Sequence, residues 1–275
     1  MVERLESREC ALVTGASGGI GLEIARVLAA KGYDLILTAR NKDALDILAA
    51  DLSGRHGITA RVHCADLAKP GAAASLYDEV TSRGAHVDIL VNNAGFATFG
   101  PFSQIDLATE HDELEVNVVA LTELTKLFLA GMLEMRKGRI LNVASTASFQ
   151  PGPLMAVYHA SKSYVLHFSE AIAEELRGSG VTVTAVCPGP TPTGFQKRAH
   201  IDDSNLLAPG STSAATVARI AVDAMLRGKT LVIPGFANAV LAWSVRFGSR
   251  RFVAGYVRRR RERIRSRAGQ KPDAL

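Results

Sequence analysis

Short apolar runs rich in β-branched residues alternate with longer segments of helical apolar spacing, and this alternation restricts the fold most strongly. Strands are expected over residues 10–14, 34–39, 59–64, 87–92, 138–145, 181–187 and 230–233. Helices are expected over residues 19–31, 42–54, 72–83, 112–135, 158–177 and 213–227. Repeated strand–helix units build a parallel sheet with helices on both faces. The sequence therefore predicts an α/β fold with a doubly wound, seven-stranded parallel sheet.

The chain has 275 residues, which one hydrophobic core can support, and no linker-like segment interrupts the pattern. We expect one domain over residues 1–235 and an extension over residues 236–275. Residues 188–210 are rich in Pro, Thr, Gly and Asp and lack a regular pattern. Because long irregular loops in compact domains are usually functional, this segment is expected to form a lid over a substrate.

The first expected strand leads through a glycine-rich turn directly into the first expected helix, in the sequence ALVTGASGGIGLEIA. Gly15, Gly19 and Gly21 let the backbone turn sharply and approach a pyrophosphate, whose charge a helix N-terminus stabilises. This placement is typical of a dinucleotide-binding βαβ unit. The sequence thus predicts a single Rossmann-type domain.

The end of the second expected strand indicates which dinucleotide is bound. NAD sites usually place an acidic residue here to hold the ribose 2′-hydroxyl, whereas this chain has Arg40. The guanidinium is a planar, charged fork that suits a 2′-phosphate. We therefore expect NADP(H) to be favoured over NAD(H); the alternative is that Arg40 is a solvated loop cation.

Tyr158 and Lys162 stand four residues apart in an expected helix, so their side chains project from one face. A tyrosine with an ordinary pKa near ~10 is a poor base at neutral pH, and a neighbouring cation favours its charged form. Ser145 follows the fifth expected strand, where its hydroxyl can hold a substrate oxygen. By itself a Tyr-x-x-x-Lys pair is usually a solvated helical pair, so its meaning depends on the other motifs.

Several motifs together carry a resemblance to a known family. They are TGASGGIG at 14–21, Asp66-Leu67, NNAG at 92–95, Asn117, Ser145, Tyr158-x-x-x-Lys162 and Pro188-Gly189. In identity, order and spacing the chain resembles the classical short-chain dehydrogenase/reductases over about residues 8–235.

The resemblance implies a catalytic tetrad of Tyr158, Lys162, Ser145 and Asn117. Tyr158 would be the general acid/base, Lys162 would lower its pKa and hold the nicotinamide ribose, and Ser145 would orient the carbonyl. Asn117 would anchor a water that relays protons.

The resemblance also implies cofactor contacts, with Asp66 at the adenine and Thr191 or Thr193 at the nicotinamide amide. The residues expected to bind the cofactor are Gly15, Ser17, Gly18, Gly19, Ile20, Gly21, Arg40, Asp66, Leu67, Asn92, Ala94, Gly95, Tyr158, Lys162, Pro188, Gly189, Thr191 and Thr193. Gln150, Pro190 and Phe195 are expected to line the substrate pocket.

The extension is apolar and then strongly cationic. Residues 246–275 hold ten Arg and one Lys against two acids, a net charge of +9, so the whole-chain charge of +5 leaves −4 for residues 1–245. Three alternatives stay open for residues 236–267: packing over the substrate pocket, contact with a partner subunit, or an interfacial helix on an anionic membrane. We do not expect nucleic-acid binding, because an arginine run alone is a weak indication of it.

The motifs together predict an NADP(H)-dependent oxidoreductase that transfers hydride between the nicotinamide and a carbonyl or alcohol. The apolar lid and extension suggest a lipophilic substrate. The alternative is a non-catalytic module of the same fold that senses a dinucleotide.

Metal chemistry and export are not expected. The seven histidines lack metal-ligand spacing, and the three cysteines lie in β-like apolar runs that predict reduced core thiols. The first residues lack the apolar stretch of an export signal, which predicts a cytoplasmic protein, with peripheral association at the inner membrane surface as an option. The resemblance implies a homodimer or homotetramer with the helices near 112–135 and 158–177 at an interface.

Overall fold

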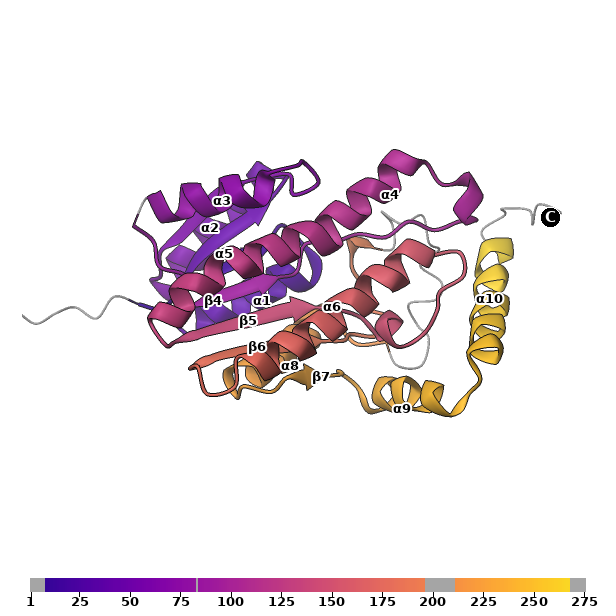
Figure 1. The fold of residues 1–275 in the computed structure, drawn as a ribbon. Helices are drawn as coiled ribbons and strands as arrows, with labels where there is room; N and C mark the ends of the chain where they lie inside the picture. The colour runs from indigo at the N-terminus through magenta and orange to yellow at the C-terminus, as the bar shows by residue number, and fades with distance from the viewer. Residues whose placement is uncertain (1–7, 83, 196–210, 268–275) are drawn as a thin grey trace, which may run out of the picture.

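The computed structural model describes residues 8–82, 84–195 and 211–267, with side chains up to residue 263. The described strands form one parallel seven-stranded sheet in the order β3-β2-β1-β4-β5-β6-β7 (Figure 1). They are β1 (Cys10–Thr14), β2 (Asp34–Ala39), β3 (Ala60–Cys64), β4 (Ile89–Asn92), β5 (Gly138–Val143), β6 (Val181–Val186) and β7 (Leu231–Val232). The strand order reverses between β1 and β4, which is where doubly wound sheets bind ligands. The predicted Rossmann-type fold is confirmed.

Helices cover both faces of the sheet. The first layer contains α1 (Gly19–Ala30), α2 (Lys42–His56) and α8 (Ala214–Leu226), and the second contains α3 (Ala72–Ser82), α5 (Ala120–Glu134) and α6 (Ala156–Glu175). Within β1, Ala11 and Val13 pack into the first layer and Leu12 into the second. Because strand side chains alternate between faces, a strand that is apolar at every position is buried on both.

One long helix departs from the prediction. It begins at α4 (Leu107–Leu114), five residues earlier than expected, and passes through a π-helical turn, η2 (Glu115–Val119), into α5. The combined helix Leu107–Glu134 is long and apolar enough, by length and composition alone, to cross a membrane. Its residues Leu124, Phe128 and Met132 are buried in the second layer, and a core helix meets the same criterion.

The extension forms α9 (Phe236–Ser244), the short turn η5 (Val245–Phe247) and α10 (Arg250–Arg267). Figure 1 shows α10 at the end of the molecule toward which β5 points. Val253 and Val257 of α10 are buried. A Cβ at Gly189 would lie 2.5 Å from the side-chain amide of Asn238 in α9, so this glycine permits the close approach. The extension therefore packs onto the domain.

Candidate active site

A cavity of about 1020 Å³ lies at the carboxyl ends of the strands. Its wall runs from the turn after β1 and the end of β2, past the ends of β4, β5 and β6, to α6 and α10. All the residues predicted for cofactor, catalysis and substrate contribute to this wall except Gly21, Asn92 and Asn117. The parallel sheet brings together residues that are far apart in the sequence, because its strand ends meet at one edge.

The glycine turn is shaped for close approach to an anion. Gly15 and Gly19 have φ of +66° and +58°, in the left-handed region that favours glycine. A Cβ at Gly21 would lie 2.3 Å from Nδ2 of Asn93 and 2.4 Å from the Gly15 carbonyl oxygen, so Gly21 serves packing and not the cavity wall. The N-cap of α1, Gly18, supplies no side-chain cap. The free backbone N–H groups there can bind a phosphate.

The two asparagines after β4 have different positions, which corrects one prediction. Asn92 is buried and donates to Oγ1 of Thr125 (3.0 Å) and Oδ1 of Asn142 (2.9 Å), so it points away from the cavity. Asn93, which we did not predict, lines the cavity and donates to the Thr14 carbonyl (2.9 Å). Successive side chains along a strand point to opposite faces, so Asn92 and Asn93 point in different directions. This alternation was the sequence signal that could have identified Asn93 as the cavity residue.

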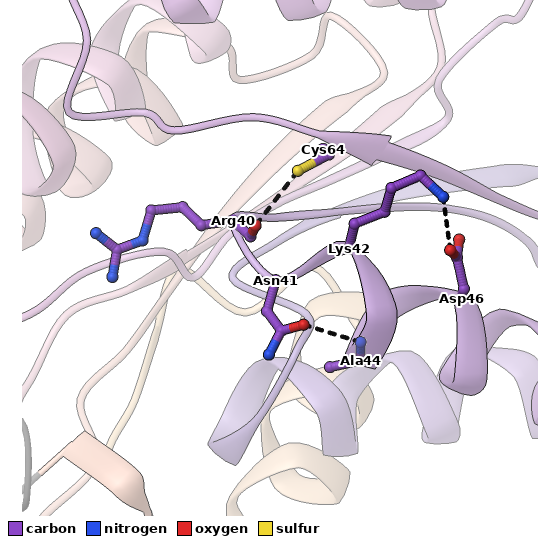
Figure 2. Close-up of polar contacts among 6 residues, drawn as sticks. All are labelled: Arg40, Asn41, Lys42, Ala44, Asp46 and Cys64. Carbon is purple, nitrogen blue, oxygen red and sulfur yellow. Dashed lines mark hydrogen bonds and ion pairs between the residues drawn. The ribbon is translucent and has the colours of Figure 1, made fainter.

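Figure 2 shows the two cations that follow β2. Lys42 Nζ binds Oδ2 of Asp46 at 2.6 Å, whereas the Arg40 side chain extends away and lines the cavity. In the described part of the chain no acid pairs with the Arg40 guanidinium. Cys64 Sγ donates to the Arg40 carbonyl at 3.3 Å; Cys64 is exposed, so its prediction as a core thiol was wrong. Arg40 is thus a cation available to a ligand at this end of the cavity.

Tyr158 and Ser145 meet at the cavity wall. Tyr158 lies on α6, and Ser145 directly follows β5, where its Oγ accepts from the Ala147 N–H at 3.1 Å. Burial raises the pKa of Tyr158 to about 12, and a hydrogen bond with Ser145 opposes this shift. The phenol is therefore protonated at neutral pH, which is the form that donates a proton.

Lys162 is buried one helical turn after Tyr158. Its Nζ donates to the Val143 carbonyl at 2.8 Å and lies 6.0 Å from the Tyr158 ring centroid. Burial lowers the pKa of Lys162 to about 8. In this arrangement the groups that lower the pKa of Tyr158 are Ser145 and Arg261. The predicted part of Lys162 in lowering the pKa of Tyr158 stays a prediction.

Asn117 lies in the π-helical turn and is fully buried behind the cavity wall. Its Oδ1 accepts from the Phe96 N–H (3.1 Å), and its Nδ2 donates to the Phe96 carbonyl (2.9 Å) and to Oγ of Ser161 (3.1 Å). A Cβ at Gly95 would lie 2.8 Å from Oδ1 of Asn117. The side chain therefore positions the segment after β4, and its predicted water relay stays a prediction.

Sequence reasoning missed Glu113, a buried acid on α4. Its Oε2 accepts from the backbone N–H (2.8 Å) and Oγ1 (2.9 Å) of Thr98, while Oε1 is buried with no hydrogen-bond partner among the described residues. Burial raises the pKa of Glu113 to about 7. Its spacing of four residues from Asn117 was the available signal.

The described part of the chain contains no cluster of three His, Cys, Asp or Glu that could hold a metal.

The substrate end of the cavity is mostly apolar. Gln150, Pro190 and Phe195 line it, and the Phe195 ring centroid lies 5.4 Å from that of Tyr158. The remainder of the predicted lid, residues 196–210, lies outside the described residues. Further wall residues that we did not predict are Phe96, Phe99, Ile105, Met155, His159, Leu241, Tyr256, Val257, Arg260 and Arg261. The last five belong to the extension, and no sequence motif indicated that the extension packs against the cavity.

Comparison with known proteins matches residues 9–204 to the short chain dehydrogenase family. A very-long-chain 3-oxoacyl-CoA reductase from Anas platyrhynchos is 35% identical over 184 residues, which are 65% of this chain and 58% of that protein. This chain thus spans little more than half of that relative's length. A putative ketoacyl reductase from Streptomyces coelicolor is 38% identical over 202 residues, 72% of this chain and 77% of that protein.

Solved structures agree with the family match. A short-chain dehydrogenase from Sphingobium yanoikuyae in complex with NADPH has a TM-score of 0.79 and 33% identity, covering 88% of this chain and 94% of that one. A 7β-hydroxysteroid dehydrogenase structure, at 22% identity and a TM-score of 0.83, shows the fold alone. The chain belongs to the short-chain dehydrogenase/reductase family. The fold of this family binds a nicotinamide dinucleotide.

Proposed function

We propose that this protein is an NADP(H)-dependent enzyme that interconverts a lipophilic carbonyl compound and its alcohol, with Tyr158 as the general acid/base. The observation that carries the proposal is the meeting of Tyr158, Ser145 and Lys162 in the wall of one cavity that is otherwise largely apolar. Relatives named as ketoacyl and 3-oxoacyl-CoA reductases support a carbonyl substrate.

The chain's own residues supply proton transfer and orientation. When bound, the reduced nicotinamide supplies a hydride to the carbonyl carbon. Ser145 donates a hydrogen bond that orients the carbonyl oxygen, and the Tyr158 phenol donates its proton as that oxygen gains negative charge. The buried ammonium of Lys162 then stabilises the phenolate, because an opposite charge favours the ionised form.

The cofactor fits the residues at the other end of the cavity. The uncapped N-terminus of α1 offers N–H donors to the pyrophosphate, and the left-handed backbone at Gly15 and Gly19 shapes the turn for its close approach. The Arg40 guanidinium, which has no acidic partner among the described residues, supports NADP(H) over NAD(H), since it can form a bidentate contact with a 2′-phosphate. The NADPH bound to the Sphingobium yanoikuyae relative is consistent with this preference.

The test is a panel of lipophilic ketones, aldehydes and alcohols assayed with both cofactors. Tyr158→Phe is expected to lower kcat by about 10²-fold or more, because it removes the proton donor. Turnover that survives this change undiminished would overturn the catalytic assignment, and nucleotide binding without any turnover in the wild type would favour a non-catalytic sensor.

Cofactor preference has its own variant and control. Arg40→Ala is expected to raise the KM for NADPH by about 10- to 100-fold, the value of a charge-assisted hydrogen bond, and to leave the KM for NADH unchanged. Lys42→Ala is the matched control, because Lys42 is exposed and paired with Asp46. A wild-type enzyme that prefers NADH would refute the role of Arg40.

Association is a further part of the proposal. Exposed Leu114, Val119 and Tyr164 on the long helix and α6 support a homodimer or homotetramer, which light scattering can measure. Exposed Phe236, Trp243 and Phe247 lie near arginines of the extension and support contact between a cytoplasmic protein and an anionic inner membrane surface. Co-sedimentation with anionic liposomes tests this contact.

A further inference from the structure

Arg261 brings a positive charge from the extension into the substrate end of the cavity. It is partly buried on α10 and forms part of the cavity wall. Its Nη2 lies 2.8 Å from Nε2 of His159, and its Nη1 contacts the sulfur of Met155. Both partners are in the segment that carries Tyr158, so the guanidinium is anchored beside the proposed proton donor.

His159 orients this guanidinium. Nδ1 of His159 lies 2.8 Å from the Gln150 carbonyl, and burial together with Arg261 lowers the pKa of His159 to about 4. A neutral ring that donates from Nδ1 to a carbonyl must accept at Nε2, which faces Arg261. A Cβ at Gly152 would lie 2.0 Å from Cδ2 of His159, so the ring is closely packed. The direction of the Arg261 side chain is therefore set.

No carboxylate neutralises Arg261 within the part of the chain that the structure describes. Asp112 also lines the cavity, but it is exposed and makes no ion pair with Arg261. Arg260 is exposed and adds a second cation to the same wall. A guanidinium has five N–H donors, and beyond the two contacts above the others have no partner among the described residues. A partly desolvated cation with free donors favours an anionic partner.

We propose that Arg261, supported by Arg260, binds an anionic group of the substrate, so that the substrate is a carbonyl compound carrying a carboxylate or phosphate on an apolar skeleton. This inference rests on the proposed oxidoreductase function of the same cavity. Arg40 lines the end formed by the turn after β1 and the end of β2, whereas Arg261 contacts residues flanking Tyr158. The anion that Arg261 recognises therefore belongs to the substrate and not to the cofactor.

The kinetic test uses straight-chain oxo acids with the ketone at different distances from the carboxylate, each paired with its methyl ester. The wild type is expected to show a kcat/KM for the best acid about 10- to 100-fold above that for its ester, and Arg261→Gln is expected to bring the kcat/KM for the acid down to that for the ester. Arg261→Lys should keep part of the ratio. Arg259→Gln is the matched control, because Arg259 is exposed on the same helix and outside the cavity wall.

Binding separates failure of this inference from failure of the proposed function. Calorimetry with decanoate, decyl phosphate and decanol needs no turnover, and the two anions distinguish a carboxylate site from a phosphate site. We expect the wild type and Arg259→Gln to bind one anion more tightly than decanol, and Arg261→Gln to bind all three alike. Equal binding of all three by the wild type would overturn the inference. So would an equal loss of acid and ester turnover in Arg261→Gln with a shifted pH profile, because Arg261 would then act through Tyr158.

Discussion

Glu113→Gln tests whether the buried carboxyl group on α4 makes the stability of the protein depend on pH. Burial raises the pKa of Glu113 from its ordinary value of 4.5 to about 7, so the folded state binds a proton more strongly than the unfolded state. Stability linked to this group is fully present below pH 4.5 and is lost as the pH rises to about 7. Relative to the protonated group, a shift of this size lowers the free energy of unfolding by about 3 kcal/mol at pH 8 and by about 1 kcal/mol at pH 5.

Glutamine keeps an oxygen that can accept from Thr98 and cannot ionise, so it imitates the protonated acid. We expect Glu113→Gln to be more stable than the wild type by about 3 kcal/mol at pH 8 and by about 1 kcal/mol at pH 5. Urea unfolding at pH 5, 6.5 and 8 measures these differences. Glu134→Gln, at an exposed position on the same continuous helix, is the control and should show no such trend. A difference that does not change with pH, or a variant less stable at pH 8, would refute this account of Glu113.

Two further predictions concern the glycine turn and the start of α2. Gly21→Ala places a Cβ 2.3 Å from Nδ2 of Asn93 and is expected to cost about 1–3 kcal/mol of stability and to weaken NADPH binding. Thermal unfolding measures the stability and fluorescence titration measures the binding. Unchanged binding would contradict the packing role of Gly21. Asn41→Ala removes the side-chain cap on the Ala44 N–H, shown in Figure 2, and is expected to cost about 1 kcal/mol in urea unfolding. Asn41→Ser restores a capping oxygen, so a loss of the same size in both variants would show that capping is not the cause.

Local pattern determined the architecture of this protein. A strand such as β1, with the consecutive apolar residues Ala11, Leu12 and Val13, is buried on both faces, and seven short strand-like segments separated by helices predict a parallel doubly wound sheet. The same pattern missed the first turn of α4, because Asp106 caps a segment whose polar residues, including Glu110 and Glu113, are buried against the rest of the site. Helix ends of this kind depend on contacts that the local sequence does not encode.

Motif spacing also determined which residues gather in the site. Tyr158, Ser145 and Arg40 face one cavity because each lies at or near the carboxyl end of a strand or on a helix beside it, and parallel topology brings those ends together. The sequence by itself placed Asn92 in the cavity wall. In the structure Asn92 points into the protein core, toward Thr125 and Asn142, and Asn93 lines the cavity.

Only the tertiary structure decided the environment of the titratable groups and the place of the extension. The pKa of Tyr158 and that of Glu113 are raised by burial, which depends on chain segments far away in the sequence. The arginines of α10 formed a simple charge run in the sequence, yet one of them, Arg261, enters the cavity because Val253 and Val257 pack α10 onto the domain. Composition can indicate that a cation is present, but the packing of apolar neighbours determines which cation loses its water.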